Sequence, residues 1–114
     1  MSIDVCASED LARGATRSIP LADAPSGMPR SAIVLRDQDG MVRAYVNLCM
    51  HLPVPLDGGR GRFFDRDGKY LLCRTHGALY RPEDGYCIEG PCQGMRLERL
   101  TVDEANGRVW LHAT

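Results

Sequence analysis

The sequence predicts an all-β, antiparallel fold, because its apolar residues recur with a period near two and turn residues interrupt them at short intervals. Three pairs of these segments flank turns that contain glycine, which is typical of β-hairpins. The chain has 114 residues, of which 44% are apolar and 25% are charged. This size and composition fit one folded domain with one core, so we expect a single domain over residues 1–114.

Each predicted hairpin consists of a strand, a turn that ends in glycine, and a second strand. In chain order they are 31–36, 37–40 and 41–46, then 62–64, 65–68 and 69–72, and finally 98–102, 104–107 and 108–112. A helical turn at residues 9–13 is predicted before the first hairpin, with Ser8 as its cap and Gly14 at its end.

Charge and hydropathy exclude several classes of partner. The net charge of −1 gives no basic surface for nucleic acid. No apolar run approaches the roughly 18 residues that span a membrane, and residues 1–4 lack the pattern of a secretory signal. We therefore expect a cytoplasmic protein that binds other proteins and neither nucleic acid nor membrane. Its five cysteines, an odd number, indicate metal binding or burial rather than a disulfide framework.

Two short segments each combine one thiol and one imidazole. Cys49 and His51 follow one predicted strand, and Cys73 and His76 follow another. The segment between them contains its own hairpin, so it can fold back and bring the two half-sites together without a long unstructured loop. Thiol and imidazole side chains grouped in this way predict a metal centre.

The order Cys-x-His followed by Cys-x-x-His resembles the cluster motif of Rieske proteins, with similarity over about residues 45–100. This resemblance implies one [2Fe–2S] cluster per chain, with Cys49 and Cys73 on one iron and His51 and His76 on the other. Two neutral imidazoles in place of two thiolates make the cluster less negative, which moves its potential to roughly −150 to +300 mV from about −400 mV. A site with such a potential suits an electron relay.

The resemblance also implies the arrangement of the fold and the function. We expect a Rieske-like antiparallel β-sandwich, with a base from residues 1–44 and 95–114 and an inserted cluster-binding lobe at 45–94. The implied protein is a soluble Rieske-type ferredoxin that passes single electrons from a reductase to a terminal oxygenase or another redox partner. It is a carrier or accessory redox subunit rather than an enzyme, and it has no small-molecule substrate. His112 is the only histidine after His76, so the mononuclear iron site of an oxygenase, with two histidines and a carboxylate, does not fit there.

Two features of the cluster loops differ from membrane-bound Rieske subunits. Those subunits carry one further cysteine in each loop, and the two form a disulfide; Val54 and Thr75 stand at these positions here. They also carry a serine and a tyrosine that donate hydrogen bonds to sulfur, where this chain has Ala78 and Tyr80. With one donor missing, we expect a potential below that of the membrane-bound class.

The other cysteines are expected to be free thiols. Cys87 falls on an apolar strand position, and Cys92 lies in Gly90-Pro91-Cys92, which resembles the proline loop that covers the cluster in this family. A disulfide between them is within reach, but a cytosolic setting favours thiols. Cys6 is predicted to be buried as a small apolar residue, and His112 to face solvent.

Two alternative functions stay open. The first is a Rieske-like small subunit of a nitrite-reductase-type complex; some members of that group lack cluster ligands, and the presence of all four here favours the carrier. The second is a binding module stabilised by zinc, since a Cys₂His₂ set also binds zinc. Zinc sites usually pair Cys with Cys and His with His in each half-site, whereas this chain alternates them.

Overall fold

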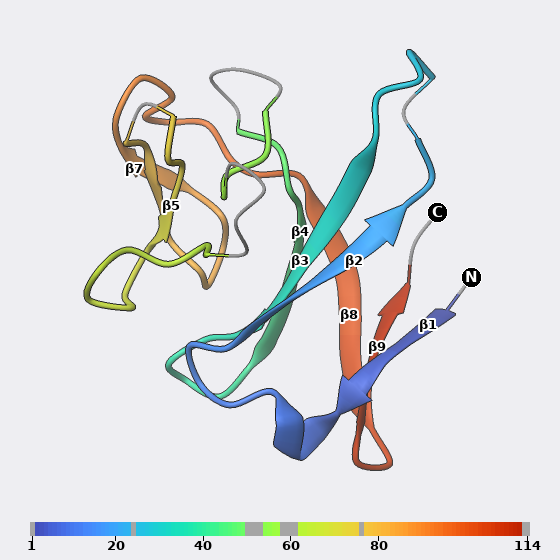
Figure 1. Ribbon diagram of the computed structural model, residues 1–114. Coiled ribbons are helices and arrows are strands. Elements are labelled where there is room, and N and C mark those ends of the chain that lie inside the picture. Colours follow the sequence, from blue (N-terminus) through green and yellow to red (C-terminus); the bar gives the residue numbers. More distant parts are fainter. Residues whose placement is uncertain (1, 24, 50–53, 58–61, 76, 113–114) are drawn as a thin grey trace. The chain divides into compact units, whose positions relative to one another are not determined.

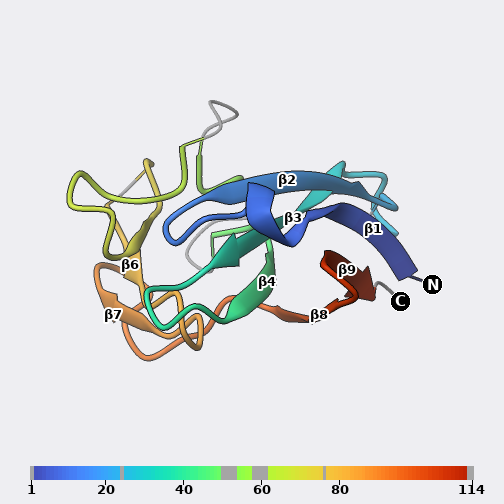
Figure 2. The ribbon, with the colours of Figure 1, turned by 90° about the horizontal axis from the view of Figure 1, so that it is seen from below.

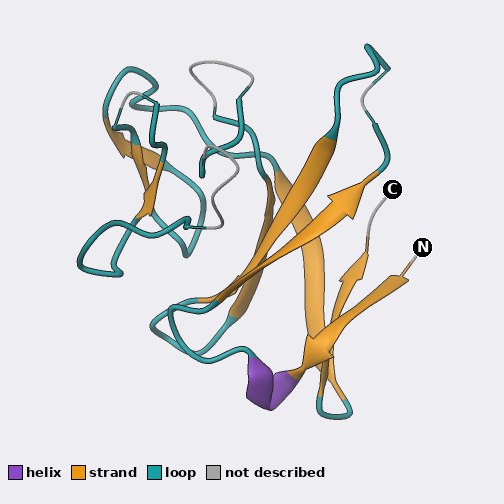
Figure 3. Ribbon diagram, viewed as in Figure 1, coloured by secondary structure: helices purple, strands orange, loops and turns teal. Residues whose placement is uncertain are grey.

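The computed structural model describes residues 2–23, 25–49, 54–57, 62–75 and 77–112. In this part of the chain it contains nine strands and one short 3₁₀ helix (Figures 1 and 3). In chain order they are β1 (Ser2–Ala7), η1 (Ser8–Asp10), β2 (Thr16–Leu21), β3 (Arg30–Arg36), β4 (Val42–Val46), β5 (Leu71–Leu72), β6 (Leu79–Tyr80), β7 (Cys87–Glu89), β8 (Arg99–Ala105) and β9 (Arg108–His112).

The strands divide between two sheets, and all of the described strand pairs are antiparallel. One sheet has six strands in the order β1-β9-β8-β4-β3-β2, and the other has three in the order β5-β6-β7. The chain separates likewise into two compact units: a six-stranded unit, Met1–Val46 with Arg99–Thr114, and a three-stranded unit, Asn47–Glu98. The predicted all-β fold is therefore confirmed, and no helix among the described residues is long and apolar enough to cross a membrane.

Alternate residues of the strands make the core of the six-stranded unit. In β9, Val109 and Leu111 are fully buried, whereas Trp110 between them is only partly buried. Successive side chains of a strand point to opposite faces, which explains this alternation. Cys6 belongs to the same core, as the sequence predicts. Figure 2, a view from below, shows the curved strands of this sheet.

The first predicted hairpin is present with its predicted turn. β3 pairs with β4, and Arg36 lies opposite Val42 at the last step before the turn. The carboxylate of Asp37 accepts hydrogen bonds from the backbone N–H groups of Asp39, at 2.9 Å, and Met41, at 3.0 Å. A short acidic side chain that bonds the following backbone in this way stabilises a turn at its own position.

The second hairpin is shorter than predicted. The expected strand at 62–64 contributes a single bridge, from Phe64 to Leu71, and β5 has only two residues. The carboxylate of Asp65 accepts hydrogen bonds from the backbone N–H groups of Lys69, at 2.9 Å, and Tyr70, at 3.3 Å. Because these N–H groups bond the turn residue, residues 69 and 70 belong to the turn rather than to the strand.

The third hairpin has a tighter turn than predicted. β8 continues to Ala105, which pairs with Arg108, so the turn consists of two residues, Asn106 and Gly107. Both adopt positive φ, 54° and 77°. This conformation is the one that an Asn-Gly pair favours in a two-residue hairpin, which explains why the strand extends past residue 102.

The helical turn near the start is also shorter than predicted. It is a 3₁₀ turn over Ser8–Asp10 that follows Ala7, and no side chain caps it. The predicted cap at Ser8 is therefore wrong. The backbone N–H of Ser8 donates to the carbonyl of Gly107, at 2.8 Å, and this bond continues the pairing of β1 with the β8–β9 hairpin.

Arg36 joins three segments of the six-stranded unit. Its guanidinium donates to the carbonyls of Leu11, at 2.6 Å, and Gly40, at 2.8 Å. It also forms a two-pronged ion pair with the carboxylate of Glu104, with one contact at 3.0 Å. The hydrogen bond from Arg36 lowers the pKa of Glu104 to about 2.

His112 faces solvent in part, as predicted, with 35% of its side-chain surface exposed. Its Nδ1 lies 2.8 Å from the hydroxyl of Ser2, and its Nε2 lies 2.8 Å from the carboxylate of Asp103. β9 has β1 on one side and β8 on the other, so its terminal side chain has polar neighbours from both strands. This pairing between distant parts of the chain carries no local sequence signal.

Candidate metal centre

The structure describes two of the four predicted ligands. Cys49 lies three residues after the end of β4, and Cys73 follows β5 directly. Both are buried, with 4% and 0% of their surface exposed. His51 and His76 lie outside the described residues.

The loop that carries Cys49 is closed by a buried polar pair. The side-chain oxygen of Asn47 accepts a hydrogen bond from the backbone N–H of Leu56, at 2.8 Å, and its side-chain nitrogen lies 3.4 Å from the carboxylate of Asp57. The N–H of Cys49 donates to the carbonyl of Val54, also at 2.8 Å. Sequence reasoning missed Asn47 and Asp57, although two polar residues at the ends of a predicted ligand loop are a usable signal.

The loop that carries Cys73 is a tight turn joined to the first loop. The N–H of Cys73 donates to the carbonyl of Ala78, and the N–H of Gly77 donates to the carbonyl of Cys73, both at 2.9 Å. Gly77 has a φ of 75°, which glycine adopts without steric cost. The N–H of Arg74 donates to the carbonyl of Leu56, at 2.9 Å. This last bond links the two ligand loops directly.

Tyr80 lies on β6, and its hydroxyl is directed at sulfur. The side chain is fully buried. The hydroxyl oxygen lies 3.4 Å from the Sγ of Cys49 and 2.9 Å from the Sγ of Cys92. The expected contact between Tyr80 and the sulfur of a predicted ligand, Cys49, is therefore present. Ala78, at the other donor position of the resemblance, is buried and carries no hydroxyl.

The third loop packs tightly against the second. A Cβ added to Gly90 would lie 2.7 Å from the Cα of Ala78, and the φ of Gly90 is 106°. Only glycine meets both conditions without a shift of the backbone. The proline loop that begins at Gly90 therefore approaches the loop of Cys73, as the resemblance implies.

Cys87 and Cys92 are two further buried thiols in this unit, with 0% and 2% exposed. Both are free, and their sulfur atoms lie 3.0 Å apart. Burial, followed by the hydrogen bond with Cys92, raises the pKa of Cys87 to about 12. At neutral pH Cys87 is therefore a protonated thiol. The positions match the sequence prediction of one apolar strand residue and one loop residue.

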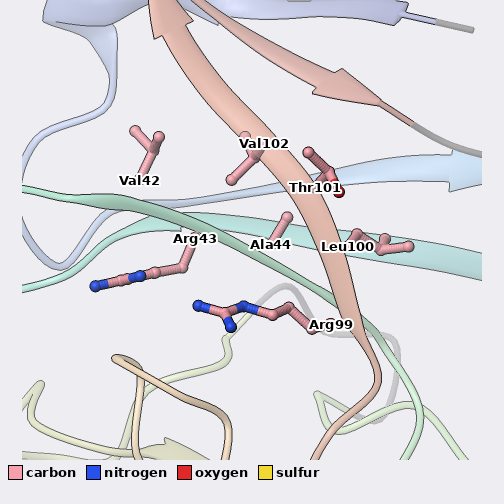
Figure 4. Close-up of a pocket in the computed structure, with 7 residues that line it drawn as sticks. All are labelled: Val42, Arg43, Ala44, Arg99, Leu100, Thr101 and Val102. Carbon is pink, nitrogen blue, oxygen red and sulfur yellow. The ribbon is translucent and has the colours of Figure 1, made fainter.

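A pocket in the six-stranded unit contains none of the predicted ligands. Figure 4 shows its lining residues on β4 and β8, namely Val42, Arg43, Ala44, Arg99, Leu100, Thr101 and Val102. Arg43 forms an ion pair with the buried carboxylate of Asp37, at 3.1 Å. The lining combines two arginines and a threonine with apolar side chains, and it contains no thiol or imidazole group.

The described donor set fits an iron–sulfur cluster. Thiolate sulfur is a soft ligand and binds iron in such clusters. Cys49 and Cys73 supply two buried sulfurs from two loops that a backbone hydrogen bond connects. A hydrogen-bond donor to sulfur is one of the means by which proteins adjust the potential of a cluster, and the Tyr80 hydroxyl is in that position.

Comparison with known proteins supports the same conclusion. The chain matches the family model of the Rieske [2Fe-2S] domain over residues 1–102. It is 32% identical over 84 residues to the toluene-4-sulfonate monooxygenase system iron-sulfur subunit of Comamonas testosteroni, and the alignment covers 69% of this chain and 22% of that protein.

Solved structures also share the fold, and two of them illustrate it. One is the reduced complex between oxygenase and ferredoxin in carbazole 1,9a-dioxygenase, with a TM-score of 0.74 and 23% identity over 96% of this chain and 27% of the other. Another is the terminal oxygenase of carbazole 1,9a-dioxygenase from Novosphingobium sp. KA1, with a TM-score of 0.73 and 23% identity over 96% of this chain and 29% of the other. The chain thus spans less than a third of the length of these relatives. From its sequence and fold, the chain belongs to the Rieske [2Fe–2S] domain family, whose cofactor is a [2Fe–2S] cluster and whose role is electron transfer.

Proposed function

We propose that Cys49 and Cys73 bind one iron of the cluster and that His51 and His76 bind the other. The burial of both thiols and the hydrogen bond between their loops support this assignment. The family match covers both loops. The bound cluster accepts and releases one electron at a time.

The residues around Cys49 and Cys73 control the access of water to the two sulfur atoms and the negative charge on them. Burial of Cys49 and Cys73 keeps water from the sulfur ligands. The hydroxyl of Tyr80 donates to the Cys49 sulfur and withdraws negative charge from it, which favours the reduced state. Ala78 supplies no second donor, so the potential lies below that of Rieske sites with both hydroxyls.

We further propose that the two units form one Rieske domain over residues 1–114, with the three-stranded unit as the cluster lobe and the six-stranded unit as the base. The unit boundaries lie two and four residues later than those of the lobe expected at 45–94 and the base expected at 1–44 and 95–114. The family match extends through segments of both units, which supports a single functional domain. In this arrangement the base is a scaffold, and the redox chemistry belongs to the lobe.

The function that fits this site best is one-electron transfer from a reductase to a terminal oxygenase or another redox partner. The observation that carries it is the buried Cys49 thiol beside the Tyr80 hydroxyl, within a Rieske ligand motif. The matched relatives are named as components of oxygenase systems, which supports an oxygenase as the acceptor. In this role the domain carries electrons and has no small-molecule substrate.

A second candidate is the Rieske domain of a terminal oxygenase. It is favoured by two of the relatives, an oxygenase-system iron-sulfur subunit and a terminal oxygenase, and by their greater length. The electron would then pass to a catalytic iron in the same assembly rather than to a separate protein. A subunit of a nitrite-reductase-type complex and a zinc-stabilised module are the two remaining alternatives.

Metal analysis of the protein purified without oxygen tests the assignment. We expect equal amounts of iron and acid-labile sulfide, and a paramagnetic signal after reduction. Cys49→Ser and Cys73→Ser should each lose iron and sulfide, whereas Cys6→Ala, a buried cysteine of the other unit, should keep both. Zinc without sulfide would identify the binding module instead.

Electron exchange separates the remaining roles. A reduced carrier should oxidise in a single step when mixed with a separate oxidised oxygenase, at a rate that rises with oxygenase concentration. A Rieske domain that belongs to a terminal oxygenase should instead be purified together with the catalytic part of that oxygenase. A subunit of a nitrite-reductase-type complex should be purified together with a large reductase.

A further inference from the structure

The hydroxyl of Tyr80 lies between two sulfur atoms, and only one of them belongs to a proposed ligand. Cys92 Sγ is the nearer, at 2.9 Å, and Cys49 Sγ is 3.4 Å away. Cys92 therefore contacts the group that controls the charge on the ligand sulfur. The role inferred below for Cys92 rests on the proposed binding of the cluster at Cys49.

The thiol protons on the far side of Cys92 have a defined direction. The carbonyl of Glu89 can only accept, and the Sγ of Cys87 donates to it at 3.3 Å. The Sγ of Cys92 then donates to the Sγ of Cys87, at 3.0 Å. The proton of Cys92 is thereby directed away from Tyr80, and its sulfur faces the Tyr80 hydroxyl as an acceptor.

Backbone hydrogen bonds and strand pairing hold Tyr80, Cys87 and Cys92 next to one another. Tyr80 on β6 pairs with Cys87 on β7. The N–H of Cys87 donates to the carbonyl of Met95, at 2.7 Å, and the N–H of Met95 donates to the carbonyl of Cys92, at 2.9 Å. Main-chain bonds therefore fix the backbone positions of both cysteines, and both side chains are buried.

A phenol has one proton, so two sulfur acceptors compete for it. We propose that Cys92 is a positioning residue that draws the Tyr80 hydrogen bond away from the Cys49 sulfur and so lowers the reduction potential of the cluster. A hydroxyl that donates to one sulfur alone gives that sulfur the whole hydrogen bond, whereas here Cys92 shares the Tyr80 hydroxyl with Cys49. The thiols of Cys92 and Cys87 exchange no electron in this role.

Removal of the competing acceptor tests the inference. In Cys92→Ala the Tyr80 hydroxyl has one sulfur acceptor fewer, so the equilibrium with a one-electron mediator should shift about threefold to tenfold toward the reduced cluster. A tenfold shift corresponds to about 59 mV for one electron. Cys6→Ala makes the same change at a buried cysteine of the other unit and should leave the potential unchanged.

A second variant tests the direction of the thiol protons. Cys87→Ala removes the acceptor of the Cys92 proton, so the Cys92 thiol can turn and donate to the Tyr80 oxygen. The phenol proton is then available to Cys49, and the potential should rise here too. Either variant combined with Tyr80→Phe should show no rise relative to Tyr80→Phe alone, whereas an effect of altered packing would persist in that background.

The possible results distinguish failure of the role inferred for Cys92 from failure of the proposed cluster site. A lower or unchanged potential in Cys92→Ala or Cys87→Ala, with iron and sulfide intact and Tyr80→Phe lowering the potential, overturns the role of Cys92. So does alkylation of the unfolded protein without reductant that leaves Cys87 and Cys92 unlabelled, because a disulfide has no thiol proton. Loss of cluster from the parent protein, or no effect of Tyr80→Phe, instead counts against the proposed site.

Discussion

Replacement of Tyr80 by phenylalanine removes one hydroxyl from the sulfur side of the proposed cluster and keeps the buried ring. The hydroxyl lies 3.4 Å from the Cys49 sulfur, within hydrogen-bond reach of a sulfur acceptor. Reduction adds negative charge to the cluster and its sulfur ligands. The hydrogen bond therefore stabilises the reduced state more than the oxidised state, and we expect Tyr80→Phe to lower the potential.

The size of the fall follows from the geometry of the two sulfur contacts. A hydrogen bond to a charged group contributes about 1.5–3 kcal/mol to stability. Only the difference between the two oxidation states acts on the potential, and Cys92 shares the donor at 2.9 Å. We therefore take a difference of about 0.5–1 kcal/mol, which corresponds to a fall of about 20–45 mV for one electron.

A spectroelectrochemical titration of the purified protein measures this shift. Tyr70→Phe is the matched control, since Tyr70 belongs to the same unit and its ring lies beside the ammonium of Lys69, at 5.8 Å. Its potential should equal that of the parent. A Tyr80→Phe protein with full cluster content and an unchanged or higher potential would refute the assignment of the hydroxyl to the ligand sulfur.

Three further predictions concern charge, packing and the missing donor. The hydrogen bond from Arg36 lowers the pKa of Glu104 to about 2 from an ordinary 4.5. The ion pair therefore stabilises the fold above pH 4.5, and this stabilisation is lost as the pH falls toward 2. Asp84 and other carboxylates also titrate in this interval. After discounting for solvent screening, denaturant unfolding should therefore show a loss of stability over that interval that is about 1 kcal/mol smaller in Glu104→Gln than in the parent protein. Gly90→Ala should lower the unfolding free energy by about 2–4 kcal/mol, because its Cβ would meet Ala78. The control Gly27→Ala, at a position with positive φ and open space around it, should lower the unfolding free energy by about 1 kcal/mol. Equal losses in the two variants would contradict the close packing of the third loop. Ala78→Ser should raise the potential by about 20–45 mV if its hydroxyl reaches sulfur, and a titration in which the potential falls would count against this placement.

Local signals in the sequence account for the parts of the fold that could be predicted. The Asp37 turn depends on its own side chain and the next few backbone groups, so it lies where it was predicted, with β4 beginning at Val42, one residue later than predicted. Asn106-Gly107 carries an equally local signal, and a reading of that pair as a two-residue turn would have extended β8 to Ala105. Pairing of the chain ends is different, because Ser2 meets His112 only once the sheet has formed.

The candidate site divides in the same way. The ligand motif was visible because the side chains of each half-site lie within a few residues of one another. The contacts that adjust the site were less accessible, since Tyr80 and Cys92 come together through the pairing of β6 with β7. Asn47 and Asp57 were missed because the sequence does not show that this polar pair is buried, although its position at the two ends of a predicted ligand loop is a usable signal.

Pulsed electron paramagnetic resonance of the reduced protein tests the central claim most directly, because it detects nitrogen nuclei bound to the paramagnetic centre. The account predicts couplings to two imidazole nitrogens, with one lost in each of His51→Ser and His76→Ser if the cluster persists in the variant. A reduced centre without any nitrogen coupling would mean an all-cysteine cluster, and a protein without a paramagnetic signal but with bound zinc would mean no cluster. Either result would contradict an electron-transfer site built from Cys49, Cys73 and the two histidines.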